Sequence, residues 1–431
     1  MRSGRKLPVP LRLYRGVTAA AALLTPAWLG YRVRKGKEDP ARLAERRGYA
    51  SAPRPKGPLV WVHGASVGEI ISVLPLIDRL MERGYGVLLT SGTLTSSRIA
   101  ARRAHPGVIH QFMPLDAHRF IRRFLDYWQP DMALLAESEL WPNLMAELSR
   151  RNTPLVLVNG RLSARSADRW ARLPVSARAL LSRVDLCLTQ TREDGDRFKA
   201  LGAPRVQVAG NLKFDVPAPP ADPVQLAQMR QMLHGRPVLL AASTHPGEDE
   251  IVIAAHRMLL QELPRLITLI APRHPERGAD ICALAESAEL VVAQRSAGHM
   301  PDPDVEIYVA DTIGELGLFY RLAPVVYVGG SLVEHGGQTP IEAAKLGAVV
   351  LHGPHVWNFG SLYRRLDQEG GATQVEDDLS LAQGVLDQFT NPELHAHTAQ
   401  AALRTMDALG GALDRTLAAI EPYLIQIRLA R

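Results

Sequence analysis

Short runs of β-branched and aliphatic residues alternate with amphipathic helical patterns from Pro58 onward. The first half of the chain predicts strands at Leu59–His63, Val87–Thr90, Met132–Ala136, Leu155–Val158, Val184–Thr189 and Val206–Ala209. Helices are expected between them, most clearly at Gly68–Arg83 and Trp141–Arg151. Apolar strands that alternate with helices are typical of βαβ units around a parallel sheet.

A proline-rich segment divides this pattern into two halves. Val216–Pro223 contains four prolines among eight residues, which is typical of a linker. The alternation then resumes, with expected strands at Val238–Ala242, Leu266–Ala271, Val305–Ala310, Val325–Val328 and Ala348–Leu351, and expected helices at Glu248–Leu260, Gly314–Arg321 and Pro340–Leu346.

The sequence therefore predicts an α/β protein with two Rossmann-like domains that face a cleft. Their expected limits are residues 37–216 and 224–398, joined by a linker at 217–223. Residues 399–431 are expected to form a helical segment, about Ala399–Ile427, that packs back on the first domain. In such folds ligands bind outside the carboxyl ends of the strands, so candidate chemistry is expected in the loops that follow the strands.

Composition and charge exclude several classes of protein. The 431 residues are 46% hydrophobic and 22% charged, which excludes disordered and fibrous proteins, and two cysteines exclude a disulfide scaffold. The net charge of +6 comes from residues 1–56, which hold 14 Lys and Arg but only 3 Asp and Glu; the remainder holds 36 basic and 41 acidic residues. Because this remainder is mildly acidic, we expect no nucleic-acid partner.

The basic N-terminal arm carries an uncharged stretch of 16 residues, Gly16–Tyr31, with Arg and Lys on both sides. A full membrane span needs roughly 20 apolar residues, and Pro26 interrupts this stretch. We interpret residues 1–36 as a membrane anchor or interfacial helix on an anionic membrane surface. A signal peptide and a soluble arm are the alternatives.

Two loops in the first half carry carboxylates. The first expected strand runs into His63-Gly64-Ala65-Ser66-Val67-Gly68-Glu69. Glu69 is either a functional carboxylate in the cleft or a residue that only complements the helix dipole. The third expected strand runs into Glu137-Ser138-Glu139-Leu140-Trp141-Pro142-Asn143. Either one of its two acids is functional or paired with an arginine, or the segment is a solvated turn. Lys213, just before the linker, is a third candidate, weak when taken alone.

Polar and glycine-rich loops follow the strands of the second half. Ser243-Thr244-His245 and the Arg273 loop offer hydroxyls, N–H groups and a guanidinium to an anion. Gly329-Gly330-Ser331 and Gly336-Gly337 form a long loop before Glu342, and such glycine nests cradle phosphate. The chain has neither dinucleotide nor P-loop fingerprints after a strand. Asp194-x-Asp196 and Asp302-x-Asp304 are interpreted as surface residues, so no metal site is expected.

Taken together, these motifs resemble the 3-deoxy-D-manno-octulosonic acid (Kdo) transferases of lipopolysaccharide synthesis. The resemblance runs in the same order over most of residues 20–365 and includes the short N-terminal anchor. The motifs on which this resemblance rests are His63–Glu69, Glu137–Asn143, Asn159–Ser163, Lys213–Asp215, Ser243–His245, Pro272–Arg277 and Val328–Glu342.

The resemblance implies a GT-B glycosyltransferase fold and an inverting transfer from CMP-Kdo to a lipid A precursor, lipid IVA, at the cytoplasmic side of the inner membrane, without metal or cofactor. Glu69 then corresponds to the general base, while Glu137 and Lys213 support the transition state. The implied CMP contacts are Pro272, Arg273, Ile313, Gly314, Glu315, Thr339, Pro340, Ile341 and Glu342. At Thr339 the family often has asparagine, and threonine retains a hydrogen-bond donor and an acceptor.

Three other functions fit part of the sequence. Another GT-B enzyme that transfers from a UDP-sugar to a lipid would share the two-domain pattern. A sugar-nucleotide 2-epimerase would share it too, without needing the cationic arm. A membrane-tethered sugar-nucleotide-binding module without catalysis predicts no base at Glu69.

Overall fold

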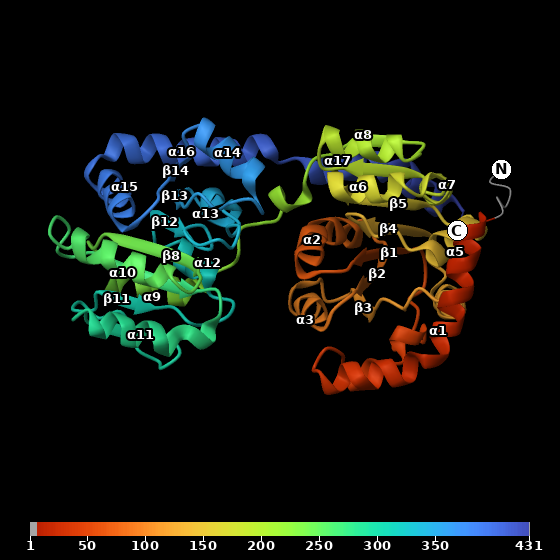
Figure 1. Ribbon diagram of the computed structural model, residues 1–431, viewed down its shortest axis with the longest axis horizontal. Coiled ribbons are helices and arrows are strands. Elements are labelled where there is room, and N and C mark those ends of the chain that lie inside the picture. Colours follow the sequence, from red (N-terminus) through yellow and green to blue (C-terminus); the bar gives the residue numbers. More distant parts are fainter. Residues whose placement is uncertain (1–6, 431) are drawn as a thin grey trace. The chain divides into compact units, whose positions relative to one another are not determined.

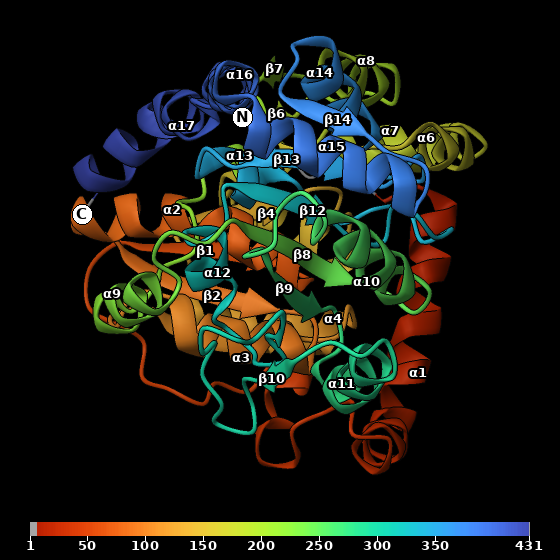
Figure 2. The same ribbon diagram turned by 90° about the vertical axis from the view of Figure 1, so that its left-hand side faces the viewer.

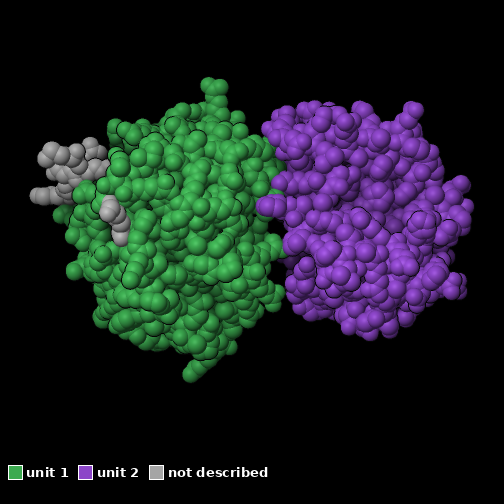
Figure 3. Space-filling view, turned by 180° about the vertical axis from the view of Figure 1, so that it is seen from behind, with its two compact units in different colours: residues 1–216, 409–431 green, residues 217–408 purple. Residues whose placement is uncertain are grey.

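The computed structural model describes residues 7–430. Two compact units make up the chain: unit 1 comprises Met1–Val216 and Leu409–Arg431, and unit 2 comprises Pro217–Ala408 (Figure 3). Each unit contains one seven-stranded sheet in which all neighbouring strands are parallel (Figure 1). The predicted pair of parallel α/β halves is therefore confirmed.

The sheet of unit 1 has the order β3-β2-β1-β4-β5-β6-β7. Its strands are β1 Leu59–Gly64, β2 Gly86–Ser91, β3 Ile109–Phe112, β4 Met132–Ala136, β5 Leu155–Gly160, β6 Leu186–Thr189 and β7 Val206–Val208. Its helices are α1 Val9–Arg34, α2 Val67–Glu82, α3 Leu94–Arg103, α4 His118–Trp128, α5 Pro142–Arg150, α6 Ala164–Ala171, α7 Pro174–Leu181, α8 Arg192–Ala200 and α17 Ala412–Leu429, with a short 3-10 turn η3 at Leu212–Phe214.

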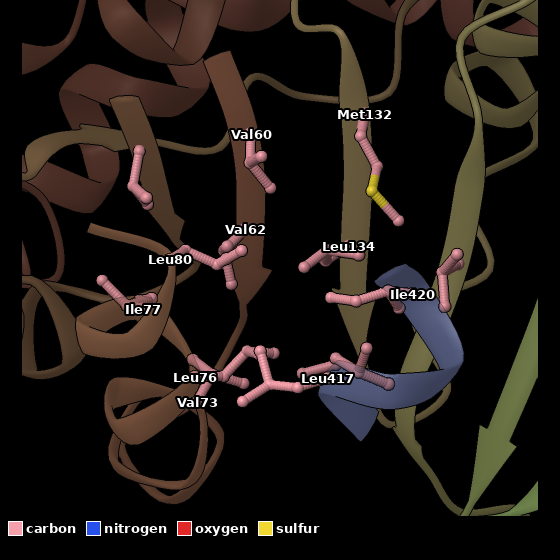
Figure 4. Packing of buried hydrophobic residues seen from close by; sticks show 14 of the residues in the cluster. Val60, Val62, Val73, Leu76, Ile77, Leu80, Met132, Leu134, Leu417 and Ile420 are labelled. Atoms are coloured by element: carbon pink, nitrogen blue, oxygen red, sulfur yellow. The ribbon is translucent and has the colours of Figure 1, made fainter. Parts of the chain in front are cut away.

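Both faces of this sheet are buried, which explains the continuous apolar strands. Successive side chains of a strand point to opposite faces, so Val60 and Val62 join one core and Leu59 and Trp61 the other. The first core is closed by α2, α3 and α17, and the second by α4, α5, α7 and α8. Figure 4 shows the first of these cores, with Val60 and Val62 of β1 near Ile77 and Leu80 of α2.

The sheet of unit 2 has the order β10-β11-β9-β8-β12-β13-β14 (Figure 2). Its strands are β8 Val238–Thr244, β9 Ile267–Pro272, β10 Val292–Gln294, β11 Ile307–Val309, β12 Val325–Val328, β13 Val349–His352 and β14 Ala372–Gln374. Its helices are α9 Pro223–Met232, α10 Glu248–Leu259, α11 Gly278–Ser287, α12 Leu316–Tyr320, α13 Ile341–Lys345, α14 Gly360–Gln368, α15 Asp378–Thr390 and α16 Pro392–Leu409. Side chains of α10, α11 and α15 share one core with the strands.

The single C-terminal helix expected at about Ala399–Ile427 is wrong. Two helices, α16 and α17, cover this stretch, because Gly411 adopts φ +80° and ends the regular helical path. The Asp215 carboxylate accepts the N–H groups of Gly411 and Leu413, at 2.6 and 2.7 Å, and so holds the start of α17. Leu417 and Ile420 of α17 then pack into the core of unit 1 (Figure 4).

The N-terminal arm forms one helix, α1, of 26 residues that runs through Pro26. One side packs on unit 1 against α4 and α5, with Leu11, Ala22 and Leu29 buried, while many apolar side chains on the other side are exposed. Among the helices of residues 7–430, none is long and apolar enough to cross a membrane.

Candidate functional site

The strand order of unit 1 determines where its candidate residues meet. β1 and β4 are neighbours, but the chain proceeds from β1 to β2 on one side and from β4 to β5 on the other. At such a switch point the two connecting loops diverge and leave room for a ligand beyond the carboxyl ends of the strands. Glu69 follows β1 and Glu137 follows β4, so both candidates lie at the switch point.

Glu69 is held at the first turn of α2. Ser66 caps this helix and accepts the Glu69 N–H, and the Glu69 carboxylate in return accepts the Ser66 hydroxyl at 2.8 Å and the Ala65 N–H at 2.9 Å. Glu69 is the third residue of this helix, and its carboxylate takes the N–H of Ala65, the residue before the cap, instead of the cap's own N–H as in a capping box. The residue is 8% exposed, and its carboxylate oxygens have one donor each. The carboxylate therefore has a fixed position with lone pairs left for a substrate.

Glu137 and Lys213 form an ion pair across 76 residues of sequence. Lys213 Nζ lies 3.2 Å from Glu137 Oε1, with both side chains less than a third exposed. The lysine passes over the start of α2, because its Nζ is 3.9 Å from the place that a Cβ on Gly68 would occupy. Asn159 fixes η3 by accepting the Leu212 N–H at 3.0 Å.

The backbone at Glu137 adopts φ +57°, a left-handed conformation that is rare for residues other than glycine. It directly follows β4 and turns the chain toward Glu139 and α5. Non-glycine residues in this conformation cost free energy and are concentrated at functional sites. The predicted site residues Glu69, Glu137 and Lys213 are thus brought together at one end of the sheet.

Glu139 is a member of this cluster that the sequence analysis did not select. Burial raises its pKa from 4.5 to about 7, and the negative charges of Glu69 and Glu137 add to the increase. The Trp141 indole N–H donates to its Oε2 at 2.6 Å. The available signal was the second acid of the Glu137-Ser138-Glu139 run, but only the tertiary structure places it against two further carboxylates.

His63 lies beside Glu139 and is fully buried. Its Nδ1 lies 2.8 Å from the Thr90 hydroxyl and 3.1 Å from the Thr90 carbonyl oxygen. Within residues 7–430 this Nε2 has no hydrogen-bond partner, and Glu139 Oε2 is 3.9 Å away. Burial lowers the His63 pKa to about 4. A neutral histidine beside a protonated Glu139 fits this arrangement.

In unit 2, a pocket of about 340 Å³ opens at the carboxyl ends of β8, β9 and β11. Four of the nine predicted CMP contacts line it: Pro272, Arg273, Ile313 and Gly314. Ser243, with φ +60°, lies at the end of β8 and lines the same pocket. The exposed Arg273 side chain supplies a planar, permanently charged group suited to phosphate.

The other five predicted contacts do not line this pocket. Glu315 is paired with Arg295, at 2.6 Å, and accepts the Thr312 hydroxyl, and these bonds to Arg295 are the main reason that its pKa is lowered. Thr339, Pro340, Ile341 and Glu342 form the start of α13, where the Thr339 hydroxyl accepts the Ile341 N–H at 3.3 Å.

The glycine-rich loop is organised by a residue that the sequence analysis missed. The Glu248 carboxylate, fully buried at the start of α10, accepts the N–H groups of Gly330, Ser331 and Leu332 at 2.6 to 3.0 Å. It also accepts the His245 N–H at 2.9 Å and the Tyr327 hydroxyl at 2.5 Å. The expectation that the N–H groups of Gly330, Ser331 and His245 are available to an anion is therefore wrong, because the Glu248 carboxylate already accepts them.

The acidic pairs differ in their surroundings. Asp194 is not a surface residue: it is 5% exposed and accepts the Leu162 N–H at 2.8 Å, which joins α8 to the loop after β5. Asp302 and Asp304 are exposed, as expected. Over the part of the chain that the structure describes, no group of three or more His, Cys, Asp or Glu residues is arranged to hold a metal ion.

Comparison with known proteins identifies relatives of this chain. The family model for 3-deoxy-D-manno-octulosonic-acid transferase (kdotransferase) matches residues 41–216. The chain is 37% identical over 428 residues to the 3-deoxy-D-manno-octulosonic acid transferase of Bordetella pertussis, which covers 95% of this chain and 99% of that protein. It is 35% identical over 393 residues to the enzyme of the same name from Haemophilus influenzae, which covers 89% and 91%.

A likeness in three dimensions extends to more distant proteins. A glycosyltransferase from Rickettsia africae matches with a TM-score of 0.57 over 86% of this chain and 99% of that one, at 12% identity. Such a likeness shows the fold alone, and it confirms the expected GT-B class. The identity to the two relatives extends over both units, and on that evidence the chain belongs to the family of 3-deoxy-D-manno-octulosonic acid (Kdo) transferases.

Proposed function

We propose that this Kdo transferase moves Kdo from CMP-Kdo to a hydroxyl of lipid IVA in lipopolysaccharide biosynthesis, with Glu69 as the general base. The relatives named above are Kdo transferases, which disfavours a UDP-sugar transferase, a 2-epimerase and a binding module without catalysis. The observation that carries the assignment of the base is the Glu69 carboxylate, held at the switch point by Ala65 and Ser66.

The chemistry requires such a group. A sugar hydroxyl has a high pKa, so its attack on an anomeric carbon is aided by a base within about 3 Å that accepts the proton as the bond forms. Glu69 has lone pairs free for this purpose and does not need to reorient, because its two hydrogen bonds already fix it. The ion pair of Glu137 and Lys213 lies beside it and places a positive charge near the reacting groups.

The donor is assigned to the pocket of unit 2. CMP has one phosphate, whose charge a single arginine such as Arg273 balances without a metal ion. Pro272, Ile313 and Gly314 line the same pocket. Glu315 and Thr339–Glu342 stay in the proposal through the resemblance to the family, and Glu342 is the candidate partner of the ribose hydroxyls.

The acceptor is a lipid, and α1 suits a protein that works at a membrane surface. Its outer side carries exposed Val9, Leu13, Val17 and Leu23, each more than half exposed. Arg12 and Arg15 lie among these apolar side chains, further Arg and Lys residues follow Tyr31, and such cations favour anionic headgroups. We assign the protein to the cytoplasmic side of the inner membrane, where residues 1–36 contact the anionic surface.

Mass spectrometry of lipid IVA after incubation with the protein and CMP-Kdo tests the proposal. The expected result is an acceptor heavier by one or more Kdo residues, together with release of CMP. A parallel incubation with a UDP-sugar should leave the acceptor unchanged. An unmodified acceptor in the presence of CMP-Kdo, with a protein that unfolds cooperatively on heating, would contradict the proposed reaction.

A further inference from the structure

A second hollow in unit 1 has the character of a lipid site. It measures about 420 Å³ and lies between α1 and the segment that leads into α4. Its walls include Ala21, Leu24 and Trp28 of α1, Phe120 of α4, and Trp141. Leu24 is 70% exposed and Trp28 is 44% exposed, with the Arg32 guanidinium over the Trp28 ring, so much of this apolar surface is open. The volume is within the range of ordinary ligand sites.

The polar groups in the floor of this hollow satisfy one another. The Asp116 carboxylate accepts the Tyr14 hydroxyl at 3.1 Å and the N–H groups of Asn143 and Leu144 at 3.0 Å. The Asn143 side chain donates in turn to the Thr18 hydroxyl of α1 at 3.0 Å. These bonds fasten α1 to the first turn of α5, so the hollow is preformed and has no strong demand for a polar ligand.

Trp141 connects the hollow to the carboxylate cluster. Its ring lines the hollow, and its indole N–H donates to Glu139, whose pKa responds to the charge of Glu69. Trp141 and Glu139 therefore lie one after the other between the apolar cavity and the proposed catalytic base. A chain that fills this cavity would have its polar end close to Glu69.

Basic residues adjoin the same cavity. An open hollow of about 550 Å³ on α4 is lined by His118, Arg119, Arg122 and Arg123, together with Asp126 and Tyr127. Arg119 donates to the Ala22 carbonyl of α1 at 2.5 Å, so it stands between the two hollows. An apolar pocket next to three arginines is complementary to a molecule that carries both acyl chains and phosphates.

We propose that the cavity between α1 and Phe120 binds an acyl chain of the glycolipid acceptor and that the α4 arginines face its phosphate. This inference rests on the proposed function, because it assigns a site for the acceptor of that reaction. The acyl chain anchors the acceptor, and Trp141 and Glu139 separate this anchor from the base.

A pair of matched variants tests the proposal in the full-length protein. Ala21→Phe adds a ring in the cavity wall, whereas Ala20→Phe adds the same ring to an exposed position of α1 that does not line the cavity. In detergent, Ala21→Phe should raise the KM for lipid IVA about tenfold, the factor that corresponds to two methylene groups no longer buried. Ala20→Phe should leave this KM unchanged, and the KM for CMP-Kdo should be unchanged in both.

A second experiment uses an acceptor from which the acyl chains have been removed but which keeps its phosphates. Wild type and Ala21→Phe should use it equally well, since it has no chain to place in the cavity. Leu24→Gln, at a 70% exposed position that does not endanger folding, should raise the KM for lipid IVA as well.

Two outcomes would overturn the proposal while wild type remains active. Equal KM values for Ala21→Phe and Ala20→Phe would show that the cavity takes no acyl chain. Reduced binding of the Ala21→Phe variant to phospholipid vesicles, with normal KM in detergent, would assign the cavity to bilayer lipids instead. A wild-type protein that leaves lipid IVA unmodified would instead contradict the proposed function.

Discussion

Replacing Glu139 by glutamine should stabilise unit 1 at alkaline pH and change its stability little near pH 4.5. Glu139 lies in a partly buried site with Glu69 and Glu137, and these surroundings raise its pKa from 4.5 to about 7. Its side chain is 22% exposed, so water screens it only in part. Glutamine resembles the protonated acid in size and polarity, but it never acquires the charge.

The direction in which stability changes with pH follows from proton linkage. Below pH 4.5 Glu139 is protonated in both the folded and the unfolded chain, and ionisation costs the folded state nothing. Between pH 4.5 and 7 the unfolded chain releases this proton while the folded chain keeps it, so stability falls as pH rises. A difference of about 2.5 pKa units, at 1.36 kcal/mol each, amounts to about 3 kcal/mol once the pH is well above 7.

Urea unfolding followed by tryptophan fluorescence measures this effect in unit 1. Five of the six tryptophans belong to unit 1, all except Trp357. The gain of Glu139→Gln over wild type should grow from near zero at pH 4.5 to about 3 kcal/mol at pH 8.5. Glu82→Gln, which removes an exposed pair with Arg79, is the matched control and should show a small, constant difference.

A gain that is the same at both pH values would refute the reasoning. It would mean that Glu139 ionises as it does in the unfolded chain and that Glu69 and Glu137 do not act on it. A loss at pH 8.5 would mean that the charged form is the one that the fold stabilises.

Two further substitutions test the candidate site. Glu69→Gln should lower turnover by about 10²-fold or more while CMP affinity in calorimetry stays unchanged; near-normal turnover with a lower melting temperature would leave Glu69 only its capping role. Arg273→Ala should weaken CMP binding by roughly 1.5–3 kcal/mol, the range of charge-assisted hydrogen bonds, and Arg257→Ala, on the exposed side of α10, should not. Unchanged affinity in Arg273→Ala would remove that residue from the site.

The local pattern of apolar and polar residues predicted the strands and helices, and it also predicted in which loops the candidate residues lie. Apolar strands such as Leu59–His63 alternate with helices, and this periodicity alone specifies a sheet buried on both faces. Glu137 and Arg273 could be selected because each directly follows a strand, and Glu69 because it begins the helix after a strand, where ligands of such folds bind. Family motifs then indicated their roles, which depend on residue type and order along the chain.

Distances between remote residues were decided by the tertiary structure. The 3.2 Å contact of Lys213 with Glu137 and the raised pKa of Glu139 depend on which strands are neighbours, which no local pattern encodes. The partners of Glu248 were also decided by the tertiary structure, because its carboxylate accepts N–H groups of a loop 82 to 84 residues away. The glycines did indicate an anion there. Only the folded chain shows that this anion is the carboxylate of Glu248. Burial of a carboxylate or of an N–H group costs free energy unless it is hydrogen-bonded, and the two groups satisfy each other here.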